Sequence, residues 1–211
     1  TAGPTSPSRQ DSPHATSRAR VEGYPQAPGQ PGGMIEAPAT KEAPMPDVDA
    51  QVLATLVTEM RRLEHLGRTA LDQLTDDDQV NRLIGGESNS IAIIVRHLAG
   101  NMRSRWTDFL TTDGEKPDRQ RDDEFDATTR WTLAETKEAW ESGWACTFAA
   151  LEALTPADLP KPVRIRGEAL SAFDAIVRQV AHYGQHVGQL LMLAKHVLGP
   201  AWKTPSIPRA R

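Results

Sequence analysis

The sequence has very little cysteine. Cys146 is the single cysteine among 211 residues. One cysteine cannot form an internal disulfide, and it supplies too few thiolates for a zinc site held by several cysteines. Any bound metal would therefore need nitrogen or oxygen ligands.

Long apolar runs are also missing. No run is longer than that at residues 91–95, which is far shorter than the roughly 20 residues that a membrane-spanning helix needs. The first residues do not show the charged segment followed by an apolar segment that is typical of a signal peptide. We therefore expect a cytoplasmic protein with no membrane partner.

Neither a basic excess nor a nucleotide motif is present. The formal net charge is -4, with 25% of the residues charged, so there is no surplus of positive charge to bind the phosphates of nucleic acid. The patterns GxGxxG and GxxxxGKS/T of phosphate-binding loops are absent, as is the GxSxG pattern of serine hydrolases. Nucleic acid is therefore not an expected partner.

The chain divides into two regions of different composition. Residues 1–46 are rich in Pro, Gly, Ser, Ala and Thr, a composition that cannot offset the entropy lost when the backbone is ordered. We expect this segment to be a disordered tail. In residues 47–211 apolar side chains recur at regular spacing, which predicts one folded domain.

Four segments of this domain show the apolar spacing of three and four residues that is typical of amphipathic helices. They cover about residues 48–74, 90–110, 132–154 and 171–198. Thr132 and Glu135 form a capping-box pattern, and Gly199 ends the last segment. A polar loop at 111–130 and a short extended stretch at 163–167 lie between the helices. This pattern predicts an all-α fold, an antiparallel four-helix bundle.

Two histidines in the last helical segment have the spacing of metal ligands. His182 and His186 are four residues apart, so both imidazoles project from one face of a helix. Gln185 and Gln189 repeat this spacing. Surface or buried structural histidines remain the alternative, because such a pair is common. The pair lies beside the apolar arc of its helix, which is formed by Phe173, Val177, Val180, Val187 and Leu191.

The helical segment at 90–110 carries a third histidine at the edge of its apolar arc. His97 stands in one column with Asn101, Arg105 and Asp108, at intervals of three and four residues. An imidazole from a neighbouring helix would complete, with the histidine pair, a set of three nitrogen ligands. Such a set binds zinc or nickel and leaves a coordination position open.

Several short motifs lie in and just after the helical segment at 90–110. They are Asn89-Ser90-Ile91 through His97, Gly100-Asn101-Met102, Ser104-Arg105-Trp106, Phe109-Leu110 and Asp113-Gly114-Glu115-Lys116. Together they resemble the motifs of an uncharacterised bacterial family within the DinB/YfiT-like superfamily. The pattern HxxxHxGQ at residues 182–189 matches the second signature of the superfamily. The resemblance covers about residues 47–209. It implies a four-helix bundle in which His97, His182 and His186 hold a divalent metal, usually zinc or nickel.

The resemblance also implies a range of activities. Characterised members of the superfamily include S-transferases that use a low-molecular-weight thiol, and metal-dependent hydrolases. For this chain it implies thiol transfer or hydrolysis on a small-molecule substrate, with a water or thiol activated by the metal as nucleophile. We also expect homodimerisation through helix faces. The alternative is a non-enzymatic metal-binding or dimerisation module linked to stress response, whose metal would be saturated by a fourth protein ligand.

Polar residues near the histidines are candidates for contacts with the substrate or with the second ring nitrogen of each ligand. These candidates are Asn101, Arg105, Asp108, Glu168, Gln185 and Gln189. Arg105 would hold a substrate carboxylate or form a salt bridge with Asp108 or a loop acid. The charged residues of the 113–124 loop either close over the site or pair with one another on the surface; they are Asp113, Glu115, Lys116, Arg119, Arg121 and Asp122.

Three further residues have structural interpretations. His65 lies among charged residues, and His196 lies in the last turn of a helix, where a cation favours the helix dipole. Cys146 is beside Trp144 and is interpreted as a small buried apolar residue. None of the three is expected to take part in the chemistry.

Overall fold

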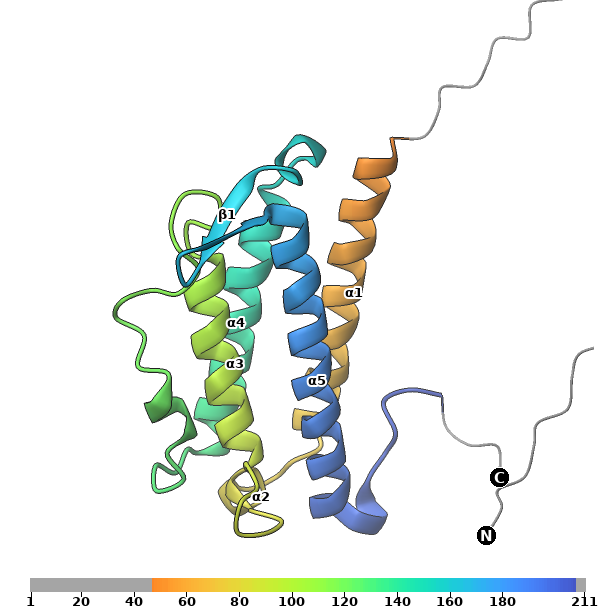
Figure 1. The fold of residues 1–211 in the computed structure, drawn as a ribbon. Coiled ribbons are helices and arrows are strands. Elements are labelled where there is room, and N and C mark those ends of the chain that lie inside the picture. Colours follow the sequence, from red (N-terminus) through yellow and green to blue (C-terminus); the bar gives the residue numbers. More distant parts are fainter. Residues whose placement is uncertain (1–46, 208–211) are drawn as a thin grey trace, which may run out of the picture. The chain divides into compact units, whose positions relative to one another are not determined.

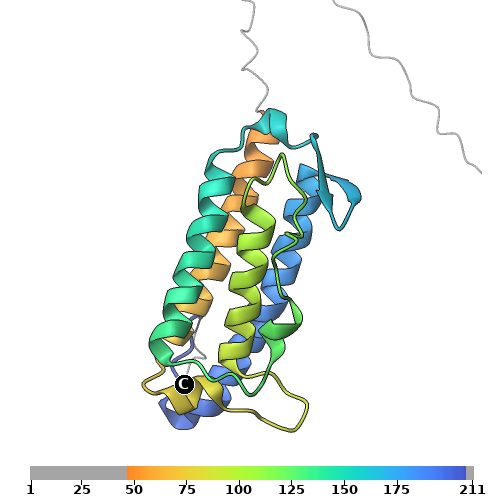
Figure 2. The same ribbon diagram turned by 90° about the vertical axis from the view of Figure 1, so that its left-hand side faces the viewer.

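The computed structural model describes residues 47–207, so the expected disordered tail lies outside the described residues. Within this range the protein is mostly helical, as predicted. The α-helices of the described residues are α1 (Val48–Leu71), α2 (Asp77–Asn81), α3 (Ile91–Trp106), α4 (Leu133–Glu152) and α5 (Ala172–Leu198). The four long helices α1, α3, α4 and α5 lie side by side (Figures 1 and 2). None of the described helices has the length and apolar content that crossing a membrane requires.

Each long helix begins at a side chain that caps its first turn. Asp47, Ser90 and Ser171 accept hydrogen bonds from backbone N–H groups three residues ahead, at the starts of α1, α3 and α5. Thr132 and Glu135 form the expected capping box before α4. These bonds satisfy backbone donors that have no partner within the helix. The predicted helix starts are therefore confirmed.

The helix ends differ from the prediction at two places. α3 ends at Trp106, before the predicted end at residue 110, and Asp108 has a positive φ of 50°. A residue in the left-handed conformation does not continue a right-handed helix. The break expected after α1 contains the short helix α2, which is capped by the side chain of Asp76.

The predicted all-α class is wrong in one respect, because a small sheet precedes α5. Strands β1 (Pro162–Ile165) and β2 (Glu168–Ser171) pair antiparallel. The turn between them uses Arg166 and Gly167, with φ of 56° and 80°. Tight two-residue hairpins favour positive φ at both central positions. The sequence predicted extended backbone here but not the second strand.

The predicted antiparallel arrangement is wrong for two pairs of neighbours, α3 with α4 and α1 with α5, because the helices of each pair pack together and run in one direction. α3 and α4 pack against each other and run in the same direction, opposite to α1 and α5 (Figure 2). Residues 107–132, here called the crossover loop, run back along α3 from its end to its beginning. On the way, the one-turn helix η1 (Asp122–Phe125) contacts α3. A long crossover connection allows neighbouring helices to be parallel, and this path brings the loop close to His97.

The core lies between the long helices and contains large aromatic side chains. Trp106, Trp144 and Tyr183 are almost fully buried. Trp106 Nε1 donates a 2.9 Å hydrogen bond to the Tyr183 hydroxyl, which links α3 to α5. Phe173 and Val177 are 39% and 41% exposed, so the apolar arc predicted for α5 is wrong at its N-terminal end.

Candidate metal centre

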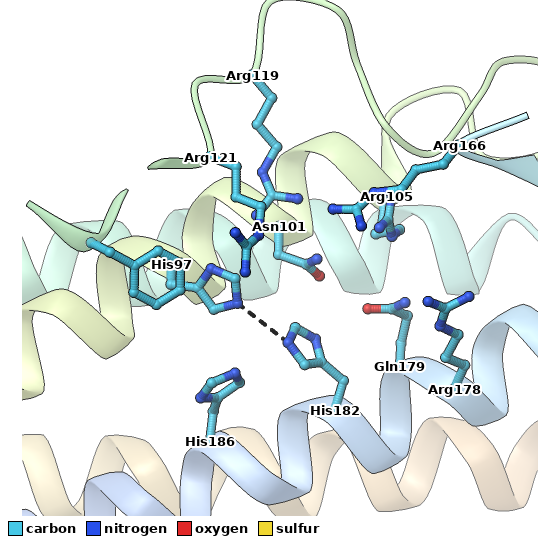
Figure 3. Close-up of a pocket in the computed structure, with 11 residues that line it drawn as sticks. His97, Asn101, Arg105, Arg119, Arg121, Arg166, Arg178, Gln179, His182 and His186 are labelled. Carbon is cyan, nitrogen blue, oxygen red and sulfur yellow. Dashed lines mark hydrogen bonds between the residues drawn. The ribbon is translucent and has the colours of Figure 1, made fainter. Parts of the chain in front are cut away.

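Three histidines from two helices meet at one cavity (Figure 3). His97 comes from α3, and His182 and His186 come from successive turns of α5. The atoms that they could offer to a metal all lie within 4.8 Å of one another. The structure therefore brings together the three residues that were predicted as metal ligands.

The distances between the rings suit a divalent metal. Zinc–nitrogen bonds of about 2.0–2.1 Å at a tetrahedral angle separate two ligand nitrogens by about 3.3–3.4 Å. Nε2 of His97 and Nε2 of His182 are 3.3 Å apart. The ring centroid of His186 is 5.0 Å from that of His97 and 4.8 Å from that of His182. All three imidazoles thus border the same point.

A buried carboxylate orients the ring of His97. Nδ1 of His97 donates a 2.9 Å hydrogen bond to Oε2 of Glu124, and Arg119 donates to both carboxylate oxygens. Burial raises the pKa of Glu124, but the hydrogen bonds from His97 and Arg119 outweigh it and hold the pKa below its usual value. The ionised carboxylate keeps a proton on Nδ1 of His97. Nε2 is then available as a metal ligand.

A glycine on α3 permits the contact between Glu124 and His97. A Cβ atom at Gly100 would overlap the carboxylate of Glu124. Gly100 lies three residues after His97, on the side of α3 that η1 covers. Glycine in a helix interior costs about 1 kcal/mol relative to alanine. The close approach of Glu124 gives a physical reason for glycine at this position.

On α5 the histidines are held in the form that binds a metal. Nδ1 of His186 donates a 2.8 Å hydrogen bond to Oε1 of Gln189, which leaves Nε2 of His186 available. Burial, followed by the charges of His186 and His97, lowers the pKa of His182 to about 3. Burial also lowers the pKa of His186, although the hydrogen bond to Gln189 opposes this. Neutral imidazole is the form that coordinates metals.

The polar column predicted on α3 belongs only partly to the site. Asn101 and Arg105 are buried and line the cavity. Asn101 accepts a 3.1 Å hydrogen bond from the Tyr183 hydroxyl. Arg105 donates to a backbone carbonyl of the crossover loop and, at 3.2 Å, to Glu115, so its ion pair is with a loop acid. Asp108 is exposed beyond the end of α3 and is not among the residues that line the cavity.

The sequence did not identify Glu124 as the partner of a histidine. Two of the candidates considered for that position, Gln185 and Glu168, are exposed. Glu124 follows His97 by 27 residues, and no periodic pattern relates a loop residue to a helix across that separation. Gly100 was a usable signal in the sequence, because a glycine three residues after His97 leaves space for another side chain to approach α3.

The crossover loop contributes both to the cavity and to its own packing. Arg119 and Arg121 line the cavity. Asp113 instead accepts hydrogen bonds from the backbone N–H groups of the hairpin turn, and so fastens the loop to the sheet. The side chain of Asp122 is 99% exposed. Arg119 and Arg121 border the cavity and also pair with the loop acids Glu115 and Asp122, so the two alternatives considered for the loop charges do not exclude each other.

The histidines open onto a cavity of about 290 Å³. This is near the lower end of the range for small-molecule sites, roughly 300–1,000 Å³. The ring of Phe125 lies 4.7 Å from that of His97 and closes one side. The positively charged residues of the wall are Arg105, Arg119, Arg121, Arg166 and Arg178 (Figure 3). Among the described residues, no aspartate or glutamate lines this cavity.

The residues given structural interpretations lie away from the cavity. His65 and His196 are exposed on α1 and α5, and neither lines its wall. Cys146 is partly buried on α4 and packs against the core. The described histidines therefore divide into three at the site and two on the surface.

Comparison with known proteins gave one match. The sequence model of a family described as "Protein of unknown function (DUF1572)" matches residues 47–211, the whole predicted domain. Neither the curated proteins nor the solved structures contain a match to this chain.

Proposed function

Because the chain belongs to the DUF1572 family of unknown function, we propose a function from the site itself. The protein is a divalent-metal-dependent enzyme that catalyses nucleophilic transfer, of the thiol S-transferase type, or hydrolysis on a small substrate. His97, His182 and His186 hold the metal, which is zinc or nickel. The observation that carries this proposal is the convergence of the three imidazoles at one cavity.

The donor set fits such a metal. Three imidazole nitrogens are a common ligand set for zinc, and nickel also binds imidazole. The hydrogen bonds to Glu124 and Gln189 hold two of the rings with Nε2 available. Metal-binding histidines almost always donate their other ring N–H in this way. The surroundings of the rings therefore support metal binding beyond the proximity of the nitrogens.

The number of ligands supports an enzyme over a structural metal module. Within residues 47–207, no fourth His, Cys, Asp or Glu joins the group. Structural zinc sites are usually saturated by four protein ligands, whereas catalytic sites use three and leave a position for substrate or water. The cavity beside the histidines gives a small molecule access to that position.

The residues of the chain position the reactants. A bound divalent ion supplies the Lewis acidity that makes a water or a thiol nucleophilic at neutral pH. Glu124 holds the ring of His97, and Arg119 in turn holds Glu124. Phe125 covers one side of His97 and limits the access of water there. Asn101 and the arginines face the space in which a substrate would bind.

We also propose a fold type, a cellular compartment and an oligomeric state for the protein. The ligands come from the second and fourth long helices, α3 and α5, which supports a four-helix bundle of the DinB/YfiT-like type. A cytoplasmic homodimer is the assembly that we propose. Its oligomeric state can be measured by light scattering on the full chain.

The first test is the metal content of the full chain, purified without a histidine tag or chelator. We expect near-stoichiometric zinc or nickel in the wild type by inductively coupled plasma mass spectrometry. The double variant His182→Ala, His186→Ala should lose the metal while its circular dichroism spectrum stays helical. Thiol-transfer and hydrolase assays of the metal-loaded protein then separate the two reaction types.

The matched control removes two histidines that lie outside the cavity. The double variant His65→Ala, His196→Ala changes α1 and α5 at exposed positions and should keep its metal. A wild type that takes up neither zinc nor nickel after reconstitution would contradict the proposal, as would equal loss of metal in the control. If the site variant does not fold, visible absorption of the wild type titrated with Co²⁺ reports nitrogen coordination independently.

A further inference from the structure

The charge of the cavity wall is opposite to that of the whole chain. The chain carries a formal net charge of -4. The cavity is nevertheless lined by five arginines and, among the described residues, by no acidic side chain. Clefts lined by charge of one sign concentrate ligands of the opposite sign. Because like charges gathered at one cavity repel one another, this concentration of arginine calls for a physical explanation.

Ion pairs within the protein explain the presence of two of the five arginines. Arg119 is fully engaged, because its guanidinium group donates to Glu115 and to both oxygens of Glu124. Arg105 donates to Glu115 and to a backbone carbonyl. These two arginines hold the crossover loop against α3. They do not by themselves require a ligand.

The other three arginines have donors to spare. Arg166 uses only Nε in its bond to Glu115. Arg121 lies over the ring of Phe125 and makes one long ion pair of 3.5 Å, with the exposed Asp122. Arg178 makes no side-chain hydrogen bond or ion pair with any residue of the described range 47–207. Among the described residues, three carboxylates contact these five guanidinium groups, those of Glu115, Glu124 and Asp122.

A buried amide beside Arg178 also lacks a partner. Gln179 is 3% exposed and lines the cavity, and its Oε1 has no hydrogen-bond partner among the described residues. An unpaired polar group at such depth is costly unless a ligand or water satisfies it. Figure 3 shows Gln179 and Arg178 on adjacent positions of α5, one turn from His182. Unpaired polar groups therefore lie directly beside the histidines.

We propose that the substrate of this site is a small molecule bearing a multiply charged oxyanion, a phosphate or a dicarboxylate. Its anionic group binds to Arg178, Arg166 and Arg121, and a hydroxyl or protonated phosphate oxygen of the same molecule donates a hydrogen bond to Oε1 of Gln179. Planar guanidinium groups bind carboxylate and phosphate oxygens in pairs. This inference rests on the proposed function, since it names the substrate class of the same cavity, but anion binding is measurable without the metal.

The test is titration calorimetry of the full chain with inorganic phosphate and with succinate, at constant ionic strength, in metal-free and metal-reconstituted forms. We expect one of these anions to bind saturably. Arg178→Gln should weaken that binding at least about tenfold, the effect of losing one charge-assisted contact. The control Arg62→Gln removes an exposed arginine of α1 that does not line the cavity and should leave the affinity unchanged.

Each outcome decides the inference. Binding of phosphate assigns a phosphorylated substrate, and binding of succinate assigns a dicarboxylate; either supports an oxyanion site. The inference is overturned if neither anion binds in either form, or if Arg62→Gln weakens binding as much as Arg178→Gln does. Metal content is measured on the same preparations. Anion binding without metal uptake would refute the proposed function alone, and metal uptake without anion binding would refute this inference alone.

Discussion

The two sides of α3 differ in what they contact. Toward α4 the backbones approach closely, since a Cβ added at Gly143 would lie 3.2 Å from Cα of Ala99 and 2.9 Å from Sδ of Met102. Toward α5 the helix presents His97 and Arg105 to a cavity. One side of the helix is packed without space, and the other side keeps space for a ligand.

α3 thus uses one side for close packing against α4 and presents polar side chains to the cavity on its other side. A close-packed interface tolerates little displacement, so the α4 side fixes the position of α3. The polar side can then stay open without loss of the fold. We therefore expect changes on the packed side to alter stability, and changes on the open side to alter metal and ligand binding.

The largest effect is expected from the packed side. Met102→Ala removes a side chain of α3 that is 1% exposed and lies against Gly143 of α4, and large-to-small changes of this kind cost roughly 2–5 kcal/mol of unfolding free energy. Urea denaturation measures this loss. Leu83→Ala, at a residue that is 43% exposed, is the control and should change stability by less than about 0.5 kcal/mol. Equal losses of unfolding free energy in the two variants would contradict the proposed importance of the packed side of α3 for stability.

Metal addition should stabilise the open side by a somewhat smaller amount. Free zinc at about a hundredfold above its dissociation constant adds about 2.7 kcal/mol to the stability of a protein that binds it only when folded. We expect the melting temperature to rise with zinc and to fall with chelator in the wild type. His97→Ala should show neither change. A zinc response that persists in His97→Ala would exclude this histidine as a ligand.

Changes at residues that position the candidate ligand His97 should have a smaller effect, on the affinity for the metal. Glu124→Gln removes the charge that orients His97, and such changes typically weaken metal binding about 10- to 100-fold. Gly100→Ala should act in the same direction, because its Cβ displaces the carboxylate of Glu124. Competition with a metal indicator dye measures both affinities.

The control for the glycine variant is Gly188→Ala on α5. A Cβ at Gly188 would meet no atom within 4 Å, although Gly188 lies only two residues from His186. Its metal affinity should therefore equal that of the wild type. If both alanine variants weaken the metal equally, the effect is not due to Glu124.

The smallest expected effect is a pH dependence of the metal-free protein. The pKa of His182 is about 3 in the folded protein, below its ordinary value of 6.5. Between these values the unfolded chain binds a proton that the folded chain does not. Stability from this group is therefore complete above pH 6.5 and declines as the pH falls toward 3. The urea midpoint should fall between pH 7 and pH 5.

Replacing the histidine isolates this contribution. His182→Gln should flatten the decline, because the glutamine side chain does not titrate. His65→Gln changes an exposed histidine and should leave the decline as in the wild type. An unchanged slope in His182→Gln would contradict the depressed pKa of His182.

Much of the fold and of the ligand set could be predicted from local patterns. The starts of the long helices follow from their caps, because a cap involves residues only three positions apart. His182 and His186 share a helix face because helical periodicity places them there. The choice of His97 as the third member needed the resemblance to a known family, because spacing alone does not say which helices are neighbours.

The packing direction of α3 and α4 and the partner of His97 could not be predicted, because both depend on the path of the crossover loop. A loop has no period, so nothing in the spacing of residues 107–132 shows that it runs back along α3. That path makes α3 and α4 parallel and places Glu124 against His97. It also brings Arg119 and Arg121 to the cavity that α5 borders.

The sequence by itself determined the helical segments, their caps and the histidine pair, because hydrogen bonds and side-chain directions within a helix depend on neighbours within about one turn. The tertiary structure decided which residues surround His97, its buried partner Glu124 and the arginine-lined cavity. These features join segments far apart in the chain. Their proximity results from the packing of the whole domain, in which each close contact, such as that between Gly100 and Glu124, depends on the position of every helix around it.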